Sequence, residues 1–100
     1  MEIYRDERLL VDLGRHLVVL DNRTLSLTPK EYCLLALLVQ HAGAVVPRKT
    51  IWKRVWGDAA EVRSRRLDIH ISGLRKKLRP YADQCIETVA GVGYSFRPIR

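Results

Sequence analysis

The stretch VRSRRLDIHISGLRKKLRP, residues 62–80, decides the fold of this chain. Four apolar residues recur along it at i, i+4, i+7 and i+11, the spacing of a helix that packs on a core: Leu67, Ile71, Leu74 and Leu78. At about 100° per residue they fall within roughly 60° of arc. The residues that point away from this stripe are Arg65, Ile69, Ser72, Gly73 and Lys76. Residues 63–79 contain seven Arg or Lys and one acid, so the helix is suited to lie against a polyanion.

Charge is unevenly distributed along the 100 residues. Residues 1–46 carry five Arg or Lys against six Asp or Glu, whereas residues 47–100 carry thirteen against five. The net charge of +7 favours nucleic acid or an anionic surface as the partner. Membrane binding is the competing interpretation, but the longest apolar run, residues 32–39, is too short to span a bilayer. The charged start of the chain also lacks the apolar region of a signal peptide.

Length and apolar content indicate one globular domain over residues 1–100. Cys33 and Cys85 have neither metal-ligand spacing nor a disulfide framework, so we expect two buried free thiols in a reducing, cytoplasmic setting. The sequence has no Ser/His/Asp or Cys/His set, no pair of histidines at ligand spacing and no glycine-rich phosphate loop ahead of a helix. We therefore expect no catalytic residue, no metal and no cofactor.

The first quarter of the chain predicts a small antiparallel sheet. Residues 9–13 and 17–20 are rich in β-formers and are separated by a glycine turn. Residues 24–27 alternate polar and apolar side chains as a further strand, and residues 3–4 add an edge strand.

A helix start follows in the motif TPKE, residues 28–31. A threonine cap, a proline at the first helical position and a glutamate three residues after the cap form a capping box. The helix is expected to run to about Ala42 and, because apolar residues lie nearly all round it, to be the buried centre of the fold. A brief extended piece at residues 44–46 and a second helix at residues 48–56 follow, and a glycine stops each helix.

The chain ends in a predicted hairpin. Residues 85–89 and 94–97 flank the turn AGVG, whose two glycines tolerate the positive φ of a tight turn. Tyr94 and Phe96 share one face of the second strand, which we expect to point inward, and Ser95 lies on the other face. Helix, turn, basic helix and glycine-tipped hairpin follow one another in the order of a winged helix-turn-helix.

At four places the sequence resembles the effector domain of OmpR/PhoB-type response regulators. The matches are LTPKEYCLL at 27–35, VWG at 55–57, LDIHISGLRKKL at 67–78 and TVAGVGY at 88–94. The resemblance implies an α+β fold, a winged helix-turn-helix with an N-terminal antiparallel sheet, three helices and a C-terminal β-hairpin wing. It also implies sequence-specific binding of double-stranded DNA in bacterial transcription regulation, within a two-component system.

The resemblance assigns roles to whole segments. The recognition helix, about residues 62–79, is expected in the major groove and the wing, about residues 85–97, beside it. The family usually binds in tandem on direct repeats, so tandem or dimeric binding is expected. A receiver domain normally precedes this domain and none is present in the sequence. The alternative function is a protein-interaction module, because in the family the loop at residues 57–61 can contact RNA polymerase.

The expected DNA contacts are inferred from the angles of residues around the helix and from the positions that contact DNA in the family. They are Arg65, Arg66, Ile69, His70, Gly73, Arg75, Lys76, Trp56, Thr88 and Gly91. The arginines at the helix start can reach phosphates or a guanine edge, and the exposed isoleucine can contact a thymine methyl group. Family members often carry Arg where this chain has Gly73 and Ala90. Direct readout is therefore expected to depend more on the two arginines and on DNA shape.

Three charged residues of the helix leave alternatives open. Arg75 is expected either to contact a phosphate or to form an ion pair with an acidic residue. Asp68 is expected to accept from Arg65 or Arg66 in preference to contacting a base. Lys77 is expected to be a solvated charge.

Overall fold

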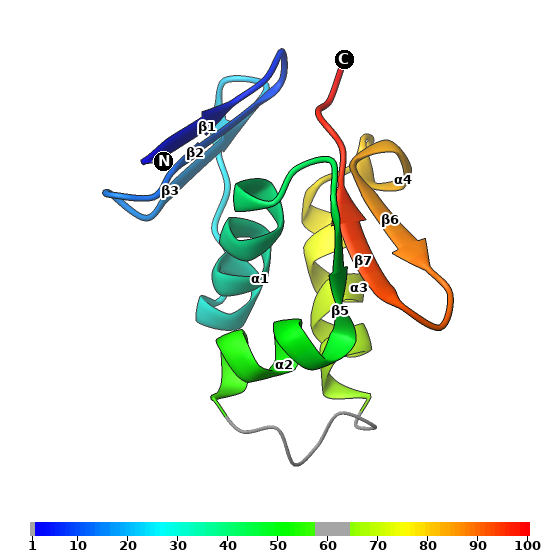
Figure 1. Ribbon diagram of the computed structural model, residues 1–100. Coiled ribbons are helices and arrows are strands. Elements are labelled where there is room, and N and C mark those ends of the chain that lie inside the picture. The colour runs from blue at the N-terminus through cyan, green and yellow to red at the C-terminus, as the bar shows by residue number, and fades with distance from the viewer. Residues whose placement is uncertain (1, 58–64) are drawn as a thin grey trace.

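The computed structural model describes residues 2–57 and 65–100, which form two antiparallel sheets and four helices (Figure 1). The first sheet has the order β1-β2-β3-β4, with strands Ile3–Arg5, Leu9–Asp12, Leu17–Leu20 and Arg23–Thr24. The helices α1 to α4 span Pro29–Gln40, Arg48–Trp56, Arg66–Lys77 and Ala82–Cys85. The second sheet has the order β5-β7-β6, with strands Val45–Pro47, Gly93–Phe96 and Ile86–Val89. No helix in the described ranges is long and apolar enough to cross a membrane.

The N-terminal sheet is confirmed, but its fourth strand is shorter than predicted. β4 ends at Thr24, whereas the alternating pattern predicted a strand over residues 24–27. The Leu25 N–H still donates to the Val18 carbonyl at 2.9 Å. The chain then leaves the sheet, because Leu25 and Leu27 turn to pack, half buried, against the core.

The capping box at the start of α1 is confirmed. Thr28 Oγ1 accepts from the Glu31 N–H, and the Glu31 carboxylate accepts from the Thr28 N–H at 2.9 Å. The helix ends at Gln40 and not at Ala42, because the chain tightens into a turn that passes through Gly43 at φ +89°. α2 matches its prediction and ends at Gly57, which has φ +78°.

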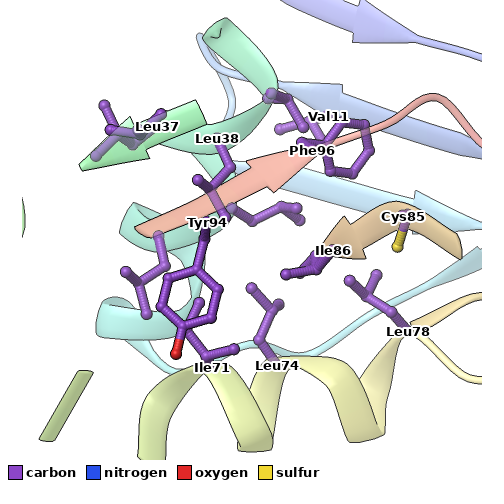
Figure 2. Packing of buried hydrophobic residues seen from close by; sticks show 14 of the residues in the cluster. Val11, Leu37, Leu38, Ile71, Leu74, Leu78, Cys85, Ile86, Tyr94 and Phe96 are labelled. Carbon is purple, nitrogen blue, oxygen red and sulfur yellow. The ribbon is translucent and has the colours of Figure 1, made fainter. Parts of the chain in front are cut away.

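The core is formed by α1, α2, α3 and both sheets, and Figure 2 shows the part of it around α3 and the second sheet. Residues 34–39 of α1 are all buried, as expected for the central helix. Figure 2 shows Ile71, Leu74 and Leu78 of α3 directed toward the side chains of the second sheet, among them Ile86. Each member of the predicted apolar stripe of α3 is at most 1% exposed. This burial fixes which face of α3 is turned outward.

The second sheet has one more strand than the predicted hairpin. The extended piece at residues 44–46 is β5, which pairs with β7 and makes it the central strand. Ser95, expected on the face opposite Tyr94, is also buried. Gly91 has the expected positive φ, but Gly93 is needed for close packing, since a Cβ there would lie 2.0 Å from the Val46 carbonyl oxygen.

The two cysteines differ in their surroundings. Cys85 belongs to α4, a helix too short to give a sequence pattern, and not to the hairpin. It is buried as predicted, and burial raises its pKa to about 12. The prediction for Cys33 is wrong, because this residue is exposed. It lies seven residues before the exposed Gln40, on a face of α1 that the core leaves uncovered.

Candidate nucleic-acid interface

The outward face of α3 presents a single row of side chains. Arg65, just before the helix, and Ile69, Ser72 and Lys76 on it are all exposed. Their spacing of four, three and four residues aligns them on one side of the helix, and we call them the outer row. Ile69 has 66% of its surface exposed. The row confirms that these residues point away from the core, and it includes Ser72, which was not among the predicted contacts.

Gly73 is turned partly toward the start of α1. A Cβ atom on Gly73 would lie 2.7 Å from Glu31 Oε2, which is closer than two such atoms normally approach. The close approach that Gly73 permits in this structure is therefore between α3 and α1.

Glu31 joins the two helices through Lys77. Lys77 Nζ lies 2.6 Å from Glu31 Oε1, and the Glu31 side chain is only 8% exposed. The prediction that Lys77 is a solvated charge is therefore wrong. Burial alone would raise the pKa of Glu31, but hydrogen bonds from Lys77 and from Thr28 hold that pKa below its usual range. The ion pair fixes the C-terminal half of α3 against the first turn of α1.

Asp68 accepts hydrogen bonds from two residues that lie outside α3. Arg48 of α2 donates to Asp68 Oδ1 at 2.7 Å, and the Tyr94 hydroxyl of β7 donates to the same oxygen. Partial burial raises the pKa of Asp68, but these two hydrogen bonds outweigh it and lower the pKa overall. Asp68 was predicted to accept hydrogen bonds from Arg65 or Arg66, but the donors that the structure shows are Arg48 and Tyr94. Asp68 connects α2, α3 and the second sheet.

Arg75 and Thr88, both predicted DNA contacts, bind each other. Arg75 Nη2 donates to Thr88 Oγ1 at 2.8 Å and to the Ile86 carbonyl at 2.9 Å. Its guanidinium carbon also lies 5.8 Å from the centre of the Tyr94 ring. The alternative of an ion pair with an acidic residue is wrong, since the partners of Arg75 are neutral groups of the wing. The side chain ties α3 to β6.

Trp56 and His70 meet where α2 passes α3. Their ring centres lie 5.5 Å apart, and Trp56 also stacks on Trp52 with ring centres 4.4 Å apart. Lys30 Nζ sits 5.5 Å from the centre of the Trp56 ring. Trp56 and His70 are half buried, so each keeps an accessible edge beside the outer row.

The tip of the wing is exposed and carries no charge. Ala90, Gly91 and Val92 are all exposed, and 48% of the Val92 surface is accessible. The expected contact at Gly91 is therefore accessible to a ligand. Of the loop at residues 57–61, expected to contact RNA polymerase, residues 58–61 lie outside the described residues, as do residues 62–64 of the predicted helix.

Residues 22–96 match the protein family described as "Transcriptional regulatory protein, C terminal". The chain belongs to this family of OmpR/PhoB-type domains. The response regulator ArlR of Staphylococcus saprophyticus is 43% identical to it over 90 residues, which cover 89% of this chain and 41% of ArlR. The chain thus spans less than half the length of that relative.

Solved structures agree with this OmpR/PhoB-type assignment. The DNA-binding domain of CpxR from E. coli is 33% identical and superposes with a TM-score of 0.87 over 100% of both chains. The DNA-binding domain of RstA from Klebsiella pneumoniae, crystallised with the RstA box, is 29% identical. It superposes with a TM-score of 0.88 over 99% of this chain and 100% of that one. The winged helix-turn-helix fold expected from the sequence motifs is confirmed.

The predicted contacts occupy three settings in this OmpR/PhoB-type domain. Most are accessible, either in the outer row, at its edges or at the wing tip, and these are Arg65, Arg66, Ile69, Lys76, Trp56, His70 and Gly91. Arg75 and Thr88 are joined to each other, and Gly73 adjoins α1. In the described part of the chain, no three His, Cys, Asp or Glu side chains lie together where a metal ion could bind.

Proposed function

We propose that this protein binds a specific sequence of double-stranded DNA and regulates transcription as the effector domain of a two-component response regulator. The observation that carries the proposal is the outer row of α3, a cation-flanked, exposed surface held rigidly by the buried stripe on the opposite side. The relative RstA was crystallised with its DNA box. In this proposal α3 enters the major groove and the wing lies beside it.

The proposed contacts are accessible residues whose side chains do not join α3 to the wing. Those to DNA are Arg65, Arg66, Ile69, Ser72 and Lys76 along α3, Trp56 and His70 at its edge, and Gly91 at the wing tip. Arg75 and Thr88 act as positioning residues that set the angle of the wing, and Gly73 sets the distance from α3 to α1. The cations serve mainly to contact phosphates, which supply most of the affinity but little sequence information.

Further parts of the proposal rest on the family. We propose that residues 1–100 act as one DNA-binding domain, without catalytic activity, in the bacterial cytoplasm. Tandem or dimeric binding on direct repeats and a contact between residues 57–61 and RNA polymerase belong to the same proposal. Replacing residues 58–61 with a glycine-serine segment should abolish capture of polymerase subunits while leaving DNA affinity unchanged, and unchanged capture would contradict the polymerase contact.

The test begins with selection of bound duplexes from a random DNA pool, followed by affinity measurements over a range of salt concentrations. Lys76→Met should lower the slope of log K against log salt by about 0.9, the effect of one lost phosphate contact. Arg15→Met removes the same charge from the turn between β2 and β3, where the Arg15 side chain is 81% exposed, and should leave the slope unchanged. Selection that enriches no sequence, or equal effects of the two substitutions, would contradict the proposal.

A further inference from the structure

The charge of the outer row varies along α3. Arg65 stands at its N-terminal end and Lys76 near its C-terminal end, whereas the two residues between them, Ile69 and Ser72, are uncharged and exposed. In a helix-turn-helix the N-terminal residues of the recognition helix contact the base edges. Ile69 is the fourth residue of α3, so this exposed apolar residue lies in the part of the row that meets bases.

Guanine is read most often by a bidentate Arg or Lys. On the C-terminal side of Ile69, position 73 has no side chain and lies against Glu31, and Arg75 is bound to the wing, so neither supplies this contact. His70 packs against Trp56 on the flank of the helix. Ile69 offers only an apolar surface, 66% exposed, and the one base group in the major groove that matches it is the C5-methyl group of thymine.

We infer that Ile69 and Ser72 form a thymine-reading patch on the outer row of α3, so that the recognised site has an A·T pair beneath this point. The inference rests on the proposed DNA binding and adds which base these two residues select. Ile69 covers the thymine methyl group, and the Ser72 hydroxyl can donate to thymine O4 or accept from the N6 amino group of the paired adenine. Both contacts are short-range, so they specify a base without adding to the salt dependence.

The experiment replaces each thymine of the selected duplex, one at a time, with deoxyuridine, which removes the methyl group and nothing else. At one or two positions the substitution should weaken binding about fourfold, the effect of one methyl group removed from an apolar contact. In Ile69→Ala the same substitution should have no effect. Ile3→Ala removes an isoleucine that is 49% exposed on β1, and it should keep the fourfold effect.

Each outcome separates the inference from the function on which it rests. Binding that is specific yet insensitive to every deoxyuridine, or equally sensitive in Ile69→Ala, would overturn the thymine-reading patch and leave the DNA-binding proposal intact. Failure of the unsubstituted protein to bind any selected duplex would overturn the proposed function itself. Ser72→Arg provides a second test, because a new guanine preference about one or two base pairs from the methyl-sensitive position would confirm that residue 72 faces the bases.

Discussion

At residue 73, the distance between α3 and α1 leaves no room for a side chain. Glu31 cannot move aside freely, since it caps α1 and pairs with Lys77 at 2.6 Å. Helix propensity favours alanine over glycine by about 1 kcal/mol, but overpacking commonly costs about 1–3 kcal/mol. The cost of the contact between an alanine side chain and Glu31 should exceed the gain in helix propensity.

We therefore expect Gly73→Ala to lower the free energy of unfolding by about 1 kcal/mol, measured by urea denaturation. In a Glu31→Ala background the same substitution should become stabilising, because only the propensity remains. Ser72→Gly is the matched control at an exposed site, and it should cost about 0.5 kcal/mol in either background. Stabilisation by Gly73→Ala in the unmodified protein would contradict the packing at this point.

Glu31 also makes stability depend on pH in a defined direction. Its pKa is lower in the folded chain than in the unfolded chain, so its contribution is fully present above the unfolded-state pKa and is lost as pH falls through the folded-state pKa. The unfolding free energies of the protein and of Glu31→Gln should therefore differ at pH 7 and converge toward pH 3. Lys77→Met should reduce the difference at pH 7. A difference in unfolding free energy that stays constant from pH 7 to pH 3 would contradict the ion pair between Glu31 and Lys77.

Among the elements, α3 and the wing are joined in part by Arg75. The Arg75 guanidinium donates to a side chain and to a carbonyl of β6. A double-mutant cycle of Arg75→Met and Thr88→Val should give a coupling free energy of about 1 kcal/mol in unfolding measurements.

DNA binding distinguishes this positioning role from a phosphate contact. Arg75→Met should weaken specific binding without changing the slope of log K against log salt, whereas Lys76→Met lowers that slope by about 0.9. Equal loss of slope in the two variants would show that Arg75 leaves the wing to contact a phosphate.

The elements that could be predicted are those whose signals are local. The buried stripe of α3, the capping box at Thr28 and the stop at Gly57 depend on residues within a few positions of one another. The ties between elements could not be predicted, because Lys77 and Glu31 are 46 positions apart, and Asp68 and Arg48 are 20 apart. A helical angle shows which way a side chain points but not which partner lies there.

In the molecule as a whole, two carboxylates tie the N-terminal sheet to the C-terminal half. Asp6 Oδ2 accepts from the Ile99 N–H at 2.9 Å, and Asp21 Oδ2 accepts from the Tyr81 hydroxyl at 2.7 Å. Asp6 also accepts from the Leu9 N–H at 2.9 Å. These two hydrogen bonds join the N-terminal sheet to segments that follow α3, whereas the outer row lies on α3 itself.

Asp6→Ala should accordingly lower the free energy of unfolding by about 2 kcal/mol, because buried N–H groups lose their acceptor. At a temperature where the variant remains folded, its affinity for the selected duplex should equal that of the unmodified protein. A loss of DNA affinity by the folded variant would show that the sheet takes part in binding.

The central claim is that the outer row of α3 and the wing tip are the surface that meets DNA. The most direct measurement is the change in backbone amide chemical shifts when the selected duplex is titrated into the protein. The account predicts that the largest changes fall in residues 65–77 and 90–92, while residues 3–24 of the N-terminal sheet stay unchanged. Changes concentrated in the sheet, with α3 unaffected, would contradict it.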